Sequence, residues 1–334
     1  MPSHCQLKMS AEESMGTQVV LKEVQTAVSK KNLPSLLKRQ FKSLSDEDGP
    51  CVRIFQWNIL AQALSQGDDN FCLCPIEALD WDNRHLHILE ELLTYNASVL
   101  CLQEVDRFSF LEEKLKSVGY KGVFFPKPYS PCLDCDISYG PDGCAVFWKT
   151  DELDLLDQEN VVLQNLMGHA TNQVSIICKF QTKKGGKQFY VAVTHLKAKN
   201  GFSDVRYEQG HFLNATLESM TGNHPVIVCG DFNAEQTEKV YEVFKTSKVG
   251  LVSSYAQLSG DGSEIPFTTW KVRGGITGKK ELSRTIDYVW FTPSKIGLKS
   301  VLMMPTVHEI GENRLPSHTY PSDHLSLVCD FVLK

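Results

Sequence analysis

Short apolar runs rich in β-branched and aromatic residues recur along the chain from residue 51 onward, and they limit the fold more than any other feature of the sequence. Runs of this kind, separated by turn residues, are typical of buried β-strands. We expect strands at residues 52–58, 99–104, 122–125, 143–149, 173–181, 188–195, 226–231, 285–291 and 325–331. Helical spacing of apolar residues is less frequent and predicts helices at residues 84–95, 204–220 and 235–244.

This mixture of many strands and few helices predicts two β-sheets packed face to face, with the helices on the outside. The segment from Lys183 to Lys187 carries two glycines between two predicted strands and indicates a β-hairpin. Residues 51–334 show neither an internal repeat nor a break in composition. We therefore expect one domain there, although a length of 334 residues would by itself suggest two.

Residues 1–50 are predicted to form an N-terminal tail that precedes this domain. Residues 1–17 are expected to be disordered. Apolar residues at helical spacing follow from Val20 to about Leu44 and are interrupted at Pro34, so a helix is expected in this part of the tail.

The polar run SDEDGP at residues 45–50 marks the expected boundary between the tail and the domain. Basic residues between 30 and 42 could belong to a targeting segment, but Glu12 and Glu13 argue against a standard transit peptide. We favour a solvated tail or a helix packed on the outside. Because every motif described below lies beyond the boundary, deletion of residues 1–45 is expected to leave the chemistry intact.

The charge of the chain argues against a general nucleic-acid-binding surface. Its net charge is −6 and its isoelectric point is about 5.9. Proteins that hold nucleic acids without sequence preference usually carry a basic surface, because their affinity comes from neutralising phosphates. A local basic patch around an anionic substrate is compatible with these numbers.

The eleven cysteines are an odd number, and the N-terminus has no apolar core of the kind that a secretory signal needs. Reduced thiols in an intracellular compartment are the simplest interpretation, and we expect a cytoplasmic location, with a mitochondrial one as the alternative. The pairs Cys72/Cys74 and Cys132/Cys135 raise the alternative of a zinc site, but their spacing favours cysteines in loops. No apolar stretch is long enough to span a membrane.

Several predicted strands end in a cluster of polar residues. The clusters are QWN at 56–58, LQE at 102–104, THLK at 194–197, GDFN at 230–233, TIDYVW at 285–290 and SDH at 322–324. A buried strand that ends in a carboxylate, an amide or an imidazole places that group at the rim of a sheet, where active sites are often assembled. Carboxylate and amide oxygens suit Mg²⁺, with Mn²⁺ as an alternative.

Other catalytic signatures are missing from the sequence. It contains no H-E-x-x-H, no G-x4-G-K-[ST] loop, no G-x-S-x-G elbow and no Rossmann glycine fingerprint. These absences disfavour a zinc peptidase, a nucleotide kinase, a serine hydrolase and a dehydrogenase.

Two groups of residues predict specific chemistry. His195, Lys197 and Lys199 alternate at the end of a predicted strand, so all three would project to one face if the strand continued. The alternative is a solvated strand end. A carboxylate at Asp287 could fix the tautomer of His324 and favour its cation, which could then stabilise a charged transition state. For a lone histidine, a surface or core role is the usual alternative.

The ordered set WN, LQE, THLK, GDFN, IDY and SDH resembles the endonuclease/exonuclease/phosphatase superfamily across residues 51–334. The resemblance implies a four-layered α/β sandwich. Within the superfamily, QWNILAQALSQ, CLQEVD, FFPKPYSP, THLKAK, VCGDFNAE, TTWK and YPSDHLSLVCDF are similar to its deadenylase-like branch.

The same resemblance implies the ligands of a magnesium ion. Glu104 would be the main ligand, Asn58 would sit beside the metal and the scissile phosphate, and Asp323 would be a direct or water-mediated ligand. The alternatives from the sequence alone are a structural carboxylate at Glu104, which would need a partner, and a turn residue at Asn58.

The resemblance also implies catalytic residues. Asp231 would orient and deprotonate the attacking water, and Asn233 would contact the phosphate or the metal, with His195, Asp287 and His324 completing the catalytic set. A turn alone could explain the Gly, Asp and Asn of the GDFN motif.

Substrate selection is expected to come from cations around this centre. Lys127 in FFPKPYSP and Arg273 after TTWK resemble substrate-contacting cations of the branch, and Asn172 is a weaker candidate. Lys197 and Lys199 complete the expected set.

For the activity, the resemblance implies removal of the 2′-phosphate from NADP(H), which gives NAD(H) and phosphate. The alternative is a poly(A)-specific 3′-exoribonuclease, which the acidic net charge disfavours, so RNA is a weaker partner than NADP(H). An inositol-phosphate or sphingolipid phosphodiesterase fits the TTWK and FFPKPYSP motifs less well. A binding module that has lost its metal is disfavoured because Glu104, Asp231 and His324 are all present.

Overall fold

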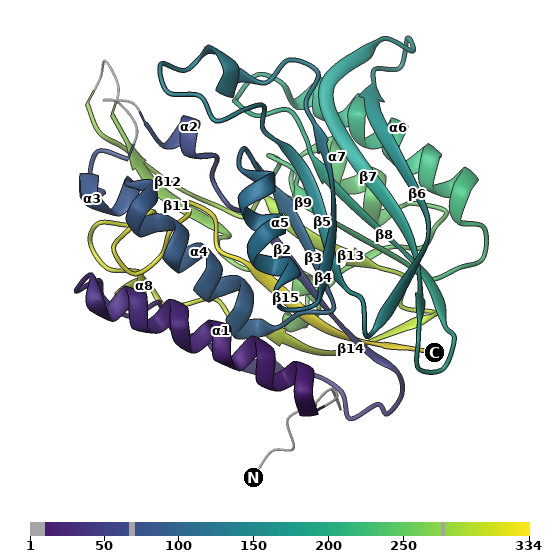
Figure 1. Ribbon diagram of the computed structural model, residues 1–334. Helices are drawn as coiled ribbons and strands as arrows, with labels where there is room; N and C mark the ends of the chain where they lie inside the picture. Colours follow the sequence, from purple (N-terminus) through teal and green to yellow (C-terminus); the bar gives the residue numbers. More distant parts are fainter. Residues whose placement is uncertain (1–10, 67–70, 275–277) are drawn as a thin grey trace.

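The computed structural model describes residues 11–66, 71–274 and 278–334 (Figure 1). The strands are β1 (Phe41–Ser43), β2 (Cys51–Asn58), β3 (Val99–Gln103), β4 (Tyr120–Pro126), β5 (Gly143–Lys149), β6 (Leu153–Gln164), β7 (Ala170–Thr182), β8 (Gln188–His195), β9 (Val226–Asp231), β10 (Val252–Ser253), β11 (Thr269–Arg273), β12 (Lys280–Arg284), β13 (Asp287–Phe291), β14 (Ile296–Leu302) and β15 (Leu327–Leu333). The helices are α1 (Ala11–Lys30), α2 (Gln62–Ser65), α3 (Ile76–Leu79), α4 (Trp81–Tyr95), α5 (Phe108–Lys116), α6 (Ser203–Thr221), α7 (Lys239–Lys245) and α8 (Val307–Ile310), with the short 3-10 helices η1 (Pro131–Asp134) and η2 (Tyr255–Leu258).

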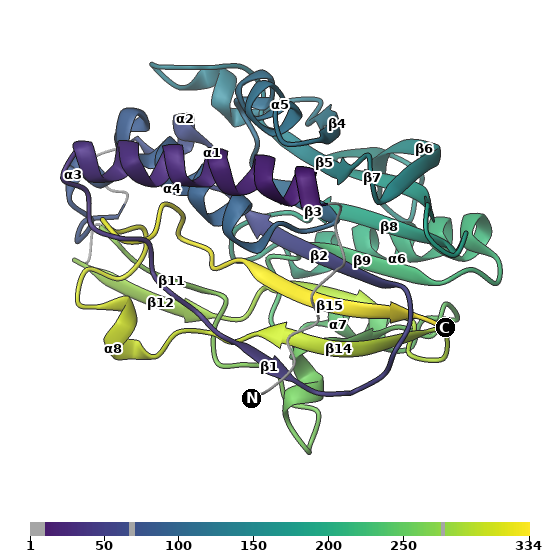
Figure 2. The same ribbon diagram turned by 60° about the horizontal axis from the view of Figure 1, so that its bottom comes forward.

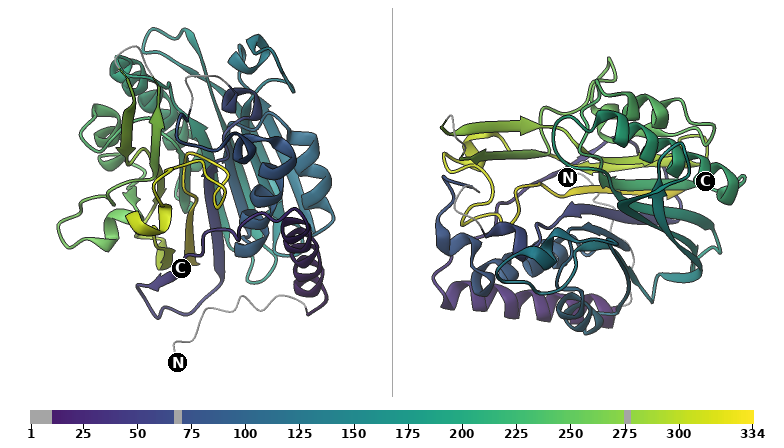
Figure 3. Two further views of the ribbon diagram at one scale, coloured as in Figure 1. Left: turned by 90° about the vertical axis from the view of Figure 1, so that its left-hand side faces the viewer. Right: turned by 90° about the horizontal axis from the view of Figure 1, so that it is seen from above.

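Two large mixed sheets form the centre of the molecule. The seven-stranded sheet has the order β1-β14-β15-β2-β3-β5-β4, and the six-stranded sheet has the order β10-β13-β9-β8-β7-β6. Each contains one parallel pair, β2 with β3 and β8 with β9, among antiparallel neighbours. The right view of Figure 3 shows the two sheets between an outer layer of purple and blue helices and an outer layer of green helices. The predicted four-layered α/β sandwich is therefore confirmed.

The alternation of side chains along each strand divides the core into three layers. In β2, Ile54 packs between the two sheets, whereas the next residue, Phe55, packs against the helices α4 and α1. In β9, Cys229 packs between the sheets and Val228 faces α6 and α7. Because successive strand residues point to opposite faces, each sheet is apolar on both sides. This explains why the strands appear in the sequence as nearly continuous apolar runs.

The strands predicted from apolar runs are all present, with bounds that differ by a few residues. The predicted hairpin joins β7 to β8, with Gln181 paired to Gln188. Six strands were not predicted from the sequence, namely β1, β6, β10, β11, β12 and β14. Among these, β11 and β12 form a separate two-stranded sheet, with an isolated bridge from Thr269 to His324. They carry many charged residues, so they lack the apolar pattern by which buried strands are recognised.

The N-terminal segment differs from its prediction. Helix α1 already begins at Ala11, and residues 1–10 lie outside the described part of the chain. The helical spacing predicted for residues 36–41 is wrong, because the chain is extended beyond Pro34 and enters β1. Proline lacks an amide hydrogen and clashes with the preceding turn of a helix, so a helix seldom continues through it.

This segment packs on the rest of the chain. Leu21 and Val24 of α1 join the core layer that contains Ile88 and Leu92 of α4. Figure 2 shows β1 beside β14, followed by β15 and β2, so the segment before the SDEDGP run supplies the edge strand of the seven-stranded sheet. Among the described helices, none is both long and apolar enough to cross a membrane.

Gly230, the glycine of the GDFN motif, can be used to test how tightly β8 and β9 pack. A Cβ atom on Gly230 would lie 2.4 Å from the carbonyl oxygen of Thr194, its partner in β8. We expect Gly230→Ala to lower the free energy of unfolding by about 1–3 kcal/mol, because inserting an atom into a packed core forces the strands apart. Urea denaturation measures this change.

Gly16→Ala is the matched control for this substitution. Gly16 lies within α1, and a Cβ atom there would meet no other atom within 4 Å. Alanine in a helix is about 0.5–1 kcal/mol more favourable than glycine, so this variant should be slightly more stable than the wild type. Equal losses in both variants would contradict the packing argument.

Candidate active site

The candidate site lies where the layer between the two sheets opens at the ends of four strands. Asn58 ends β2, His195 ends β8, Asp231 ends β9 and Asp287 begins β13. Each has the same strand parity as residues that pack between the sheets, so its side chain continues that layer. In the six-stranded sheet, Asp231 lies opposite both His195 and Asp287.

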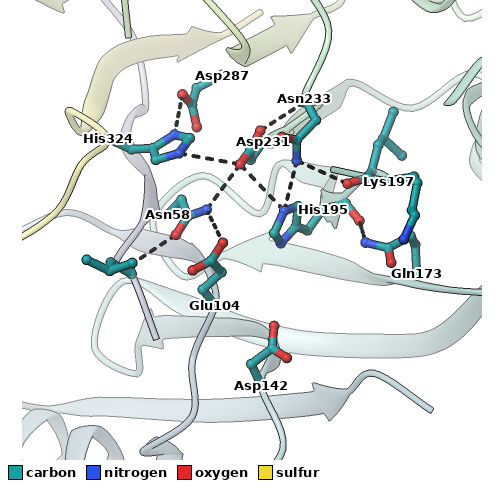
Figure 4. Close-up of polar contacts among 12 residues, drawn as sticks. Asn58, Glu104, Asp142, Gln173, His195, Lys197, Asp231, Asn233, Asp287 and His324 are labelled. Atoms are coloured by element: carbon teal, nitrogen blue, oxygen red, sulfur yellow. Dashed lines mark hydrogen bonds and ion pairs between the residues drawn. The ribbon is translucent and has the colours of Figure 1, made fainter. Parts of the chain in front are cut away.

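The amide of Asn58 joins the two sheets at this point. Its Nδ2 donates to Oε1 of Glu104 at 3.0 Å and to Oδ2 of Asp231 at 3.0 Å (Figure 4). Its Oδ1 accepts from the backbone amide of Leu60 at 3.0 Å, and the amide of Ala61 donates to Oε2 of Glu104 at 3.2 Å. The residues of the QWN and LQE motifs are thereby fixed in one network.

Three residues of this site have left-handed backbone conformations without being glycine. The φ angles are 62° at Leu60, 55° at Glu104 and 51° at Asn233. Such conformations disfavour side chains with a Cβ atom and persist where surrounding contacts impose them. Each of the three follows a strand end of the network, so the strain is concentrated where the chain turns around the site.

Asp287 orients the imidazole of His324. Its Oδ2 accepts from Nδ1 of His324 at 2.9 Å and from the hydroxyl of Thr268 at 2.6 Å, while its Oδ1 accepts from Nε2 of Gln56 at 3.1 Å. Both carboxylate oxygens are therefore engaged. The other ring nitrogen of His324, Nε2, lies 3.8 Å from carboxylate oxygens of Asp231 and of Asp323.

These carboxylates keep His324 cationic at neutral pH. Burial by itself lowers the pKa of the imidazole, but the negative charges of Asp287, Asp231 and Asp323 outweigh it and raise the pKa of His324 to about 9. The imidazolium donates from Nδ1 to Asp287 and directs Nε2–H toward the opening between Asp231 and Asp323.

Asp231 is buried with 1% of its surface exposed, and this sets its proton affinity. Burial raises the pKa of Asp231 to about 7, with His324 acting in the opposite direction and Asp287 adding to the rise. Its Oδ1 accepts from the amide of Asn233 at 2.8 Å. A carboxylate with a pKa near neutrality can accept a proton from water under physiological conditions.

His195 is in a different state from His324. Burial, followed by the positive charges of Lys127 and His324, lowers the pKa of His195 well below its ordinary value, so the ring is neutral. Its Nε2 lies 3.0 Å from the amide nitrogen of Asn233 and 3.5 Å from Asp231. Asn233 also donates to the carbonyl of Leu196 at 3.1 Å, so this amide connects the ends of β8 and β9.

Cations from separate elements approach these acidic groups. Lys127 lies after β4 and pairs with Asp142 at 2.5 Å. Burial by itself lowers the pKa of Lys127, but the charges of Asp142 and Glu104 raise it, so the ammonium stays charged. Lys271 of β11 forms an ion pair with Asp323. Burial by itself raises the pKa of Asp323, but Lys271, His324 and Arg273 outweigh it and hold the pKa well below its ordinary value.

The remaining predicted residues lie farther from the network. β8 ends at His195, as predicted, so the condition under which Lys197 and Lys199 would project to the same face as His195 is not met. The ammonium of Lys197 lies 4.8 Å from the ring centroid of Phe202, and Lys199 has a φ of 79°. Arg206 of α6 donates to both of their carbonyls at 3.0 Å, and this turns the chain away from the strand direction.

Asn172 and Arg273 also contact other groups. Asn172 accepts from the backbone amide of Tyr129 at 2.7 Å and donates to its carbonyl. The guanidinium of Arg273 lies 5.0 Å from the ring centroid of Phe71. Asn172 therefore ties the loop after β4 to β7, and Arg273 extends the two-stranded sheet toward the chain that follows α2.

Several residues of the site were not among those predicted from the sequence. They are Gln56, Asp142, Gln173, Thr268 and Lys271. Gln56 belongs to the QWN motif, and Thr268 and Lys271 belong to TTWK, so both quoted motifs carried the signal. Gln173 donates to the carbonyl of His195 at 2.8 Å, and no motif marked this contact in advance.

The donor set fits a metal ion. Carboxylate oxygens of Asp231 and Asp287 and a ring nitrogen of His324 lie within 4.8 Å of one another, all buried. Both oxygens of Asp287 already accept hydrogen bonds, and the same holds for Asp231 and Glu104, so an ion would have to share or replace some of these contacts. The raised pKa of Asp231 indicates that its buried charge is incompletely neutralised, and a divalent cation would supply the missing charge.

All the residues predicted for the site lie within the segment of the chain that matches one protein-family model. The sequence model of the endonuclease/exonuclease/phosphatase family matches residues 55–324. The chain belongs to the endonuclease/exonuclease/phosphatase family. The family match and the network of Asn58, Glu104, Asp231 and His324 thus describe the same region of the molecule.

Individual relatives place the chain more closely within the family. It is 48% identical to human nocturnin over 305 residues, which is 89% of this chain and 70% of that protein. The solved catalytic domain of human nocturnin with a bound sulfate anion has a TM-score of 0.75 and 42% identity and covers 89% of this chain and 98% of that one. The Ccr4 subunit of the CCR4-Not complex 3'-5'-exoribonuclease from Candida albicans is 29% identical over 78% of this chain and 38% of that protein.

The raised pKa values of Asp231 and His324 each predict a loss of stability as the pH rises when the site lacks a metal. The pKa of Asp231 is raised from 3.8 to about 7, and that of His324 is raised from 6.5 to about 9. Folding therefore takes up a proton at Asp231 between pH 3.8 and about 7, and at His324 between pH 6.5 and about 9. Both contributions to stability are full at low pH and are lost as the pH rises through the folded-state values.

A divalent cation should reverse this loss. We expect Mg²⁺ to raise the Tm of EDTA-treated protein more at about pH 8 than at about pH 5.5, because the cation competes with protons for the carboxylates. Differential scanning calorimetry with and without Mg²⁺ measures the two increments. Glu104→Gln should abolish the increment at pH 8. An equal increment at both pH values, or one that survives in this variant, would contradict the assignment.

Proposed function

We propose that this chain is a Mg²⁺-dependent phosphatase that removes the 2′-phosphate of NADP(H) and gives NAD(H) and phosphate, with Mn²⁺ as an alternative ion. The observation that carries the proposal is the contribution of FFPKPYSP and TTWK to the site. These motifs resemble those of nocturnin, and they bring Lys127 and Lys271 next to the acidic network. Cations at this position favour a substrate with several phosphate groups.

Asp231 is suited to the role of general base. Its carboxylate lies among Asn58, His195 and His324 and has a pKa raised to about 7. A water held beside it would lose a proton to Asp231 as its oxygen attacks phosphorus. The bond from phosphorus to the 2′-oxygen of the ribose breaks, and that oxygen takes up a proton to leave as a hydroxyl group. A base with a pKa near the working pH is the most effective, because it is both deprotonated and able to take the proton.

His324 is suited to stabilise charge on the phosphoryl oxygens. Asp287 fixes its tautomer through Nδ1, so the protonated Nε2 is directed away from Asp287 and toward the carboxylates of Asp231 and Asp323. A fixed cation in a buried site costs no reorganisation during the reaction, which is why such groups contribute strongly to catalysis. Asn58 and Asn233 hold Asp231 in place from both of its oxygens.

The metal would be held by Glu104, with Asn58 and Asp323 as further ligands. When bound, it supplies positive charge that polarises the phosphoryl group. Ions with a preference for oxygen ligands fit this set, since carboxylates and an amide dominate it. Asp323, whose pKa is held low by Lys271, remains ionised and available to such an ion or to its water ligands.

The proposed substrate-binding cations lie around the catalytic network. Lys127 follows β4, Arg273 ends β11, and Lys197 and Lys199 follow β8. NADP(H) carries a pyrophosphate as well as its 2′-phosphate, so remote cations can grip charge away from the scissile bond. The bound sulfate of the human nocturnin catalytic domain is an anion of phosphate-like shape, which supports a phosphate-accepting site in this chain too.

The second candidate is 3′-exonuclease action on poly(A). The relatedness to Ccr4, which is named as an exoribonuclease subunit, favours it. The net charge of −6 opposes it, because a chain that tracks an RNA backbone usually carries a basic groove. The greater identity to nocturnin than to Ccr4 also favours the first proposal.

A side-by-side assay distinguishes the two. Purified protein with Mg²⁺ is incubated with NADPH, NADP⁺ and a poly(A) oligonucleotide, and release of phosphate and shortening of the RNA are measured. We expect phosphate from both dinucleotides and little shortening. Shortening of poly(A) without release of phosphate would replace the first proposal by the second.

Selectivity should depend on the outlying cations. Substituting Lys197, Lys199 or Arg273 by Ala should lower kcat/KM for NADPH by about ten- to a hundredfold, since a charge-assisted contact contributes roughly 1.5–3 kcal/mol. The small ester p-nitrophenyl phosphate cannot reach these cations and should lose less.

Glu104→Ala is the control for these variants and should damage both substrates to the same degree, because the metal is needed at every scissile phosphate. Equal losses on both substrates in the lysine and arginine variants would place these cations at the scissile phosphate instead. Losses seen only with poly(A) would favour the exonuclease.

A further inference from the structure

Residues 36–43 are attached at several points to the part of the chain that carries Asp323 and His324. The amide of Leu37 donates to the carbonyl of Thr319 at 3.0 Å, and the amide of Met303 donates to the carbonyl of Gln40 at 2.9 Å. Beyond these contacts, β1 pairs with β14, which in turn pairs with β15. The segment therefore lies against the chain on both sides of the SDH motif.

Arg39 makes the most buried of these contacts. Its side chain is 1% exposed, and its Nη1 donates to the carbonyl of Ser326 at 2.8 Å. Its Nη2 donates to Glu91 of α4 at 2.7 Å and to the hydroxyl of Ser326. The guanidinium lies 5.8 Å from the ring centroids of both Tyr95 and Tyr320. A guanidinium suits this arrangement, because its N–H donors lie in one plane and can reach two partners at once.

Glu91 accepts hydrogen bonds from both ends of the loop that carries Asp323 and His324. Its Oε1 accepts from the hydroxyl of Tyr320 at 2.9 Å and from the hydroxyl of Ser326 at 2.7 Å, and the amide of Ser326 donates to the hydroxyl of Tyr320 at 2.9 Å. Tyr320 precedes Asp323 by three residues, and Ser326 follows His324 by two. The loop is thus closed on one buried carboxylate.

Arg39 is the basic side chain that neutralises this carboxylate. Glu91 is fully buried, and within the part of the chain that the structure describes its ion pair is with Arg39. A buried carboxylate without a partner is strongly unfavourable, so the position of the loop depends on a residue far upstream in the sequence. Residues 1–45 were predicted to be dispensable for the chemistry, and these contacts favour the opposite.

We propose that Arg39 is a positioning residue for the reaction, which holds Asp323 and His324 in place through Glu91, Tyr320 and Ser326. It does not touch the reacting atoms. The inference rests on the proposed function only in assuming that His324 and Asp323 act on a phosphoryl group. The segment before β2 is then part of the catalytic scaffold.

Arg39→Lys tests the proposal in the full chain. Lysine keeps the positive charge beside Glu91 but cannot donate to Ser326 and Glu91 in the same planar geometry. We expect a folded protein whose kcat for NADPH and for p-nitrophenyl phosphate falls about tenfold or more, because a small misplacement of catalytic groups is costly. KM should change by less than about threefold, because the cations expected to bind substrate lie on other elements.

Arg53→Lys is the matched control. Arg53 of β2 makes a comparable contact with Asp330 of β15, at 2.7 Å and 2.9 Å, and also donates to the carbonyl of Tyr95 at 3.0 Å. It attaches β15 four residues beyond Ser326, outside the loop. We expect a similar loss in Tm without the loss in kcat. An equal loss of kcat in both variants would assign the effect to stability and overturn the proposal.

A double variant separates stability from position. Arg39→Gln alone leaves Glu91 buried and unpaired, whereas Arg39→Gln with Glu91→Gln removes both charges. We expect the double variant to recover Tm relative to the single one while kcat stays low. Recovery of kcat to within about twofold of the wild type would show that the guanidinium does not position the loop.

A spectroscopic measurement keeps the test independent of the substrate. The Nδ1–H proton of His324, hydrogen-bonded to Asp287, can be assigned by NMR from its absence in His324→Asn. It should shift in Arg39→Lys and stay unchanged in Arg53→Lys. If the wild type releases no phosphate from NADPH, the proposed function fails while this signal still decides on Arg39. An unshifted signal in folded Arg39→Lys overturns the positioning role.

Discussion

A buried guanidinium, that of Arg84, holds together the chain segments on which the site depends. It is 1% exposed, and its nitrogens donate to the carbonyls of Ile59, Leu60 and Pro321 and to the side chain of Gln62. These carbonyls belong to the turn after Asn58 and to the chain just before the SDH motif. Burial lowers the pKa of Arg84 to about 10, with Asp106, Asp323 and Glu104 opposing the change, so the group remains charged. One cation on α4 thereby satisfies backbone oxygens that regular structure leaves without partners.

The acidic groups beyond this scaffold explain why the site is reactive rather than merely stable. The two sheets are apolar between them, and the layer ends in Asp231, Asp287 and Asp323. Lys271 balances Asp323, and His324 is shared between Asp287 and Asp231, so Asp231 is left with the least compensation. Burial is the main cause of its raised pKa, Asp287 adds to the rise, and His324 offsets only part of it. A protein that needed only stability would have gained from an apolar residue there.

The sequence predicted the layers and the central residues for a physical reason. Strands buried on both faces must be apolar throughout, so a polar residue at their end is conspicuous, as Asn58, Asp231 and Asp287 are. Lys271 and Arg39 do not stand out in this way, because neither β11 nor the segment around Arg39 is a continuous apolar run. Their importance comes from partners 52 residues or more away in the sequence, namely Asp323 for Lys271 and Glu91 for Arg39. Lys271 lies in the TTWK motif, but neither that motif nor any other local pattern identifies a partner so far along the chain.

The catalytic residues lie on the central strands, whereas the cations around them lie on outer elements. This difference affects how such a site can change its substrate. Asn58, His195, Asp231 and Asp287 are fixed by sheet register, and a shift of one residue in any of these strands would turn the side chain to the other face. Lys127 instead lies in a loop and Arg273 is the last residue of β11, where a side chain can change without altering the register of the two large sheets. Specificity carried by such outer elements can vary while the chemistry is retained. It follows that the acid–base network identifies the reaction class, while the choice among phosphate esters has to be sought in the cations around it.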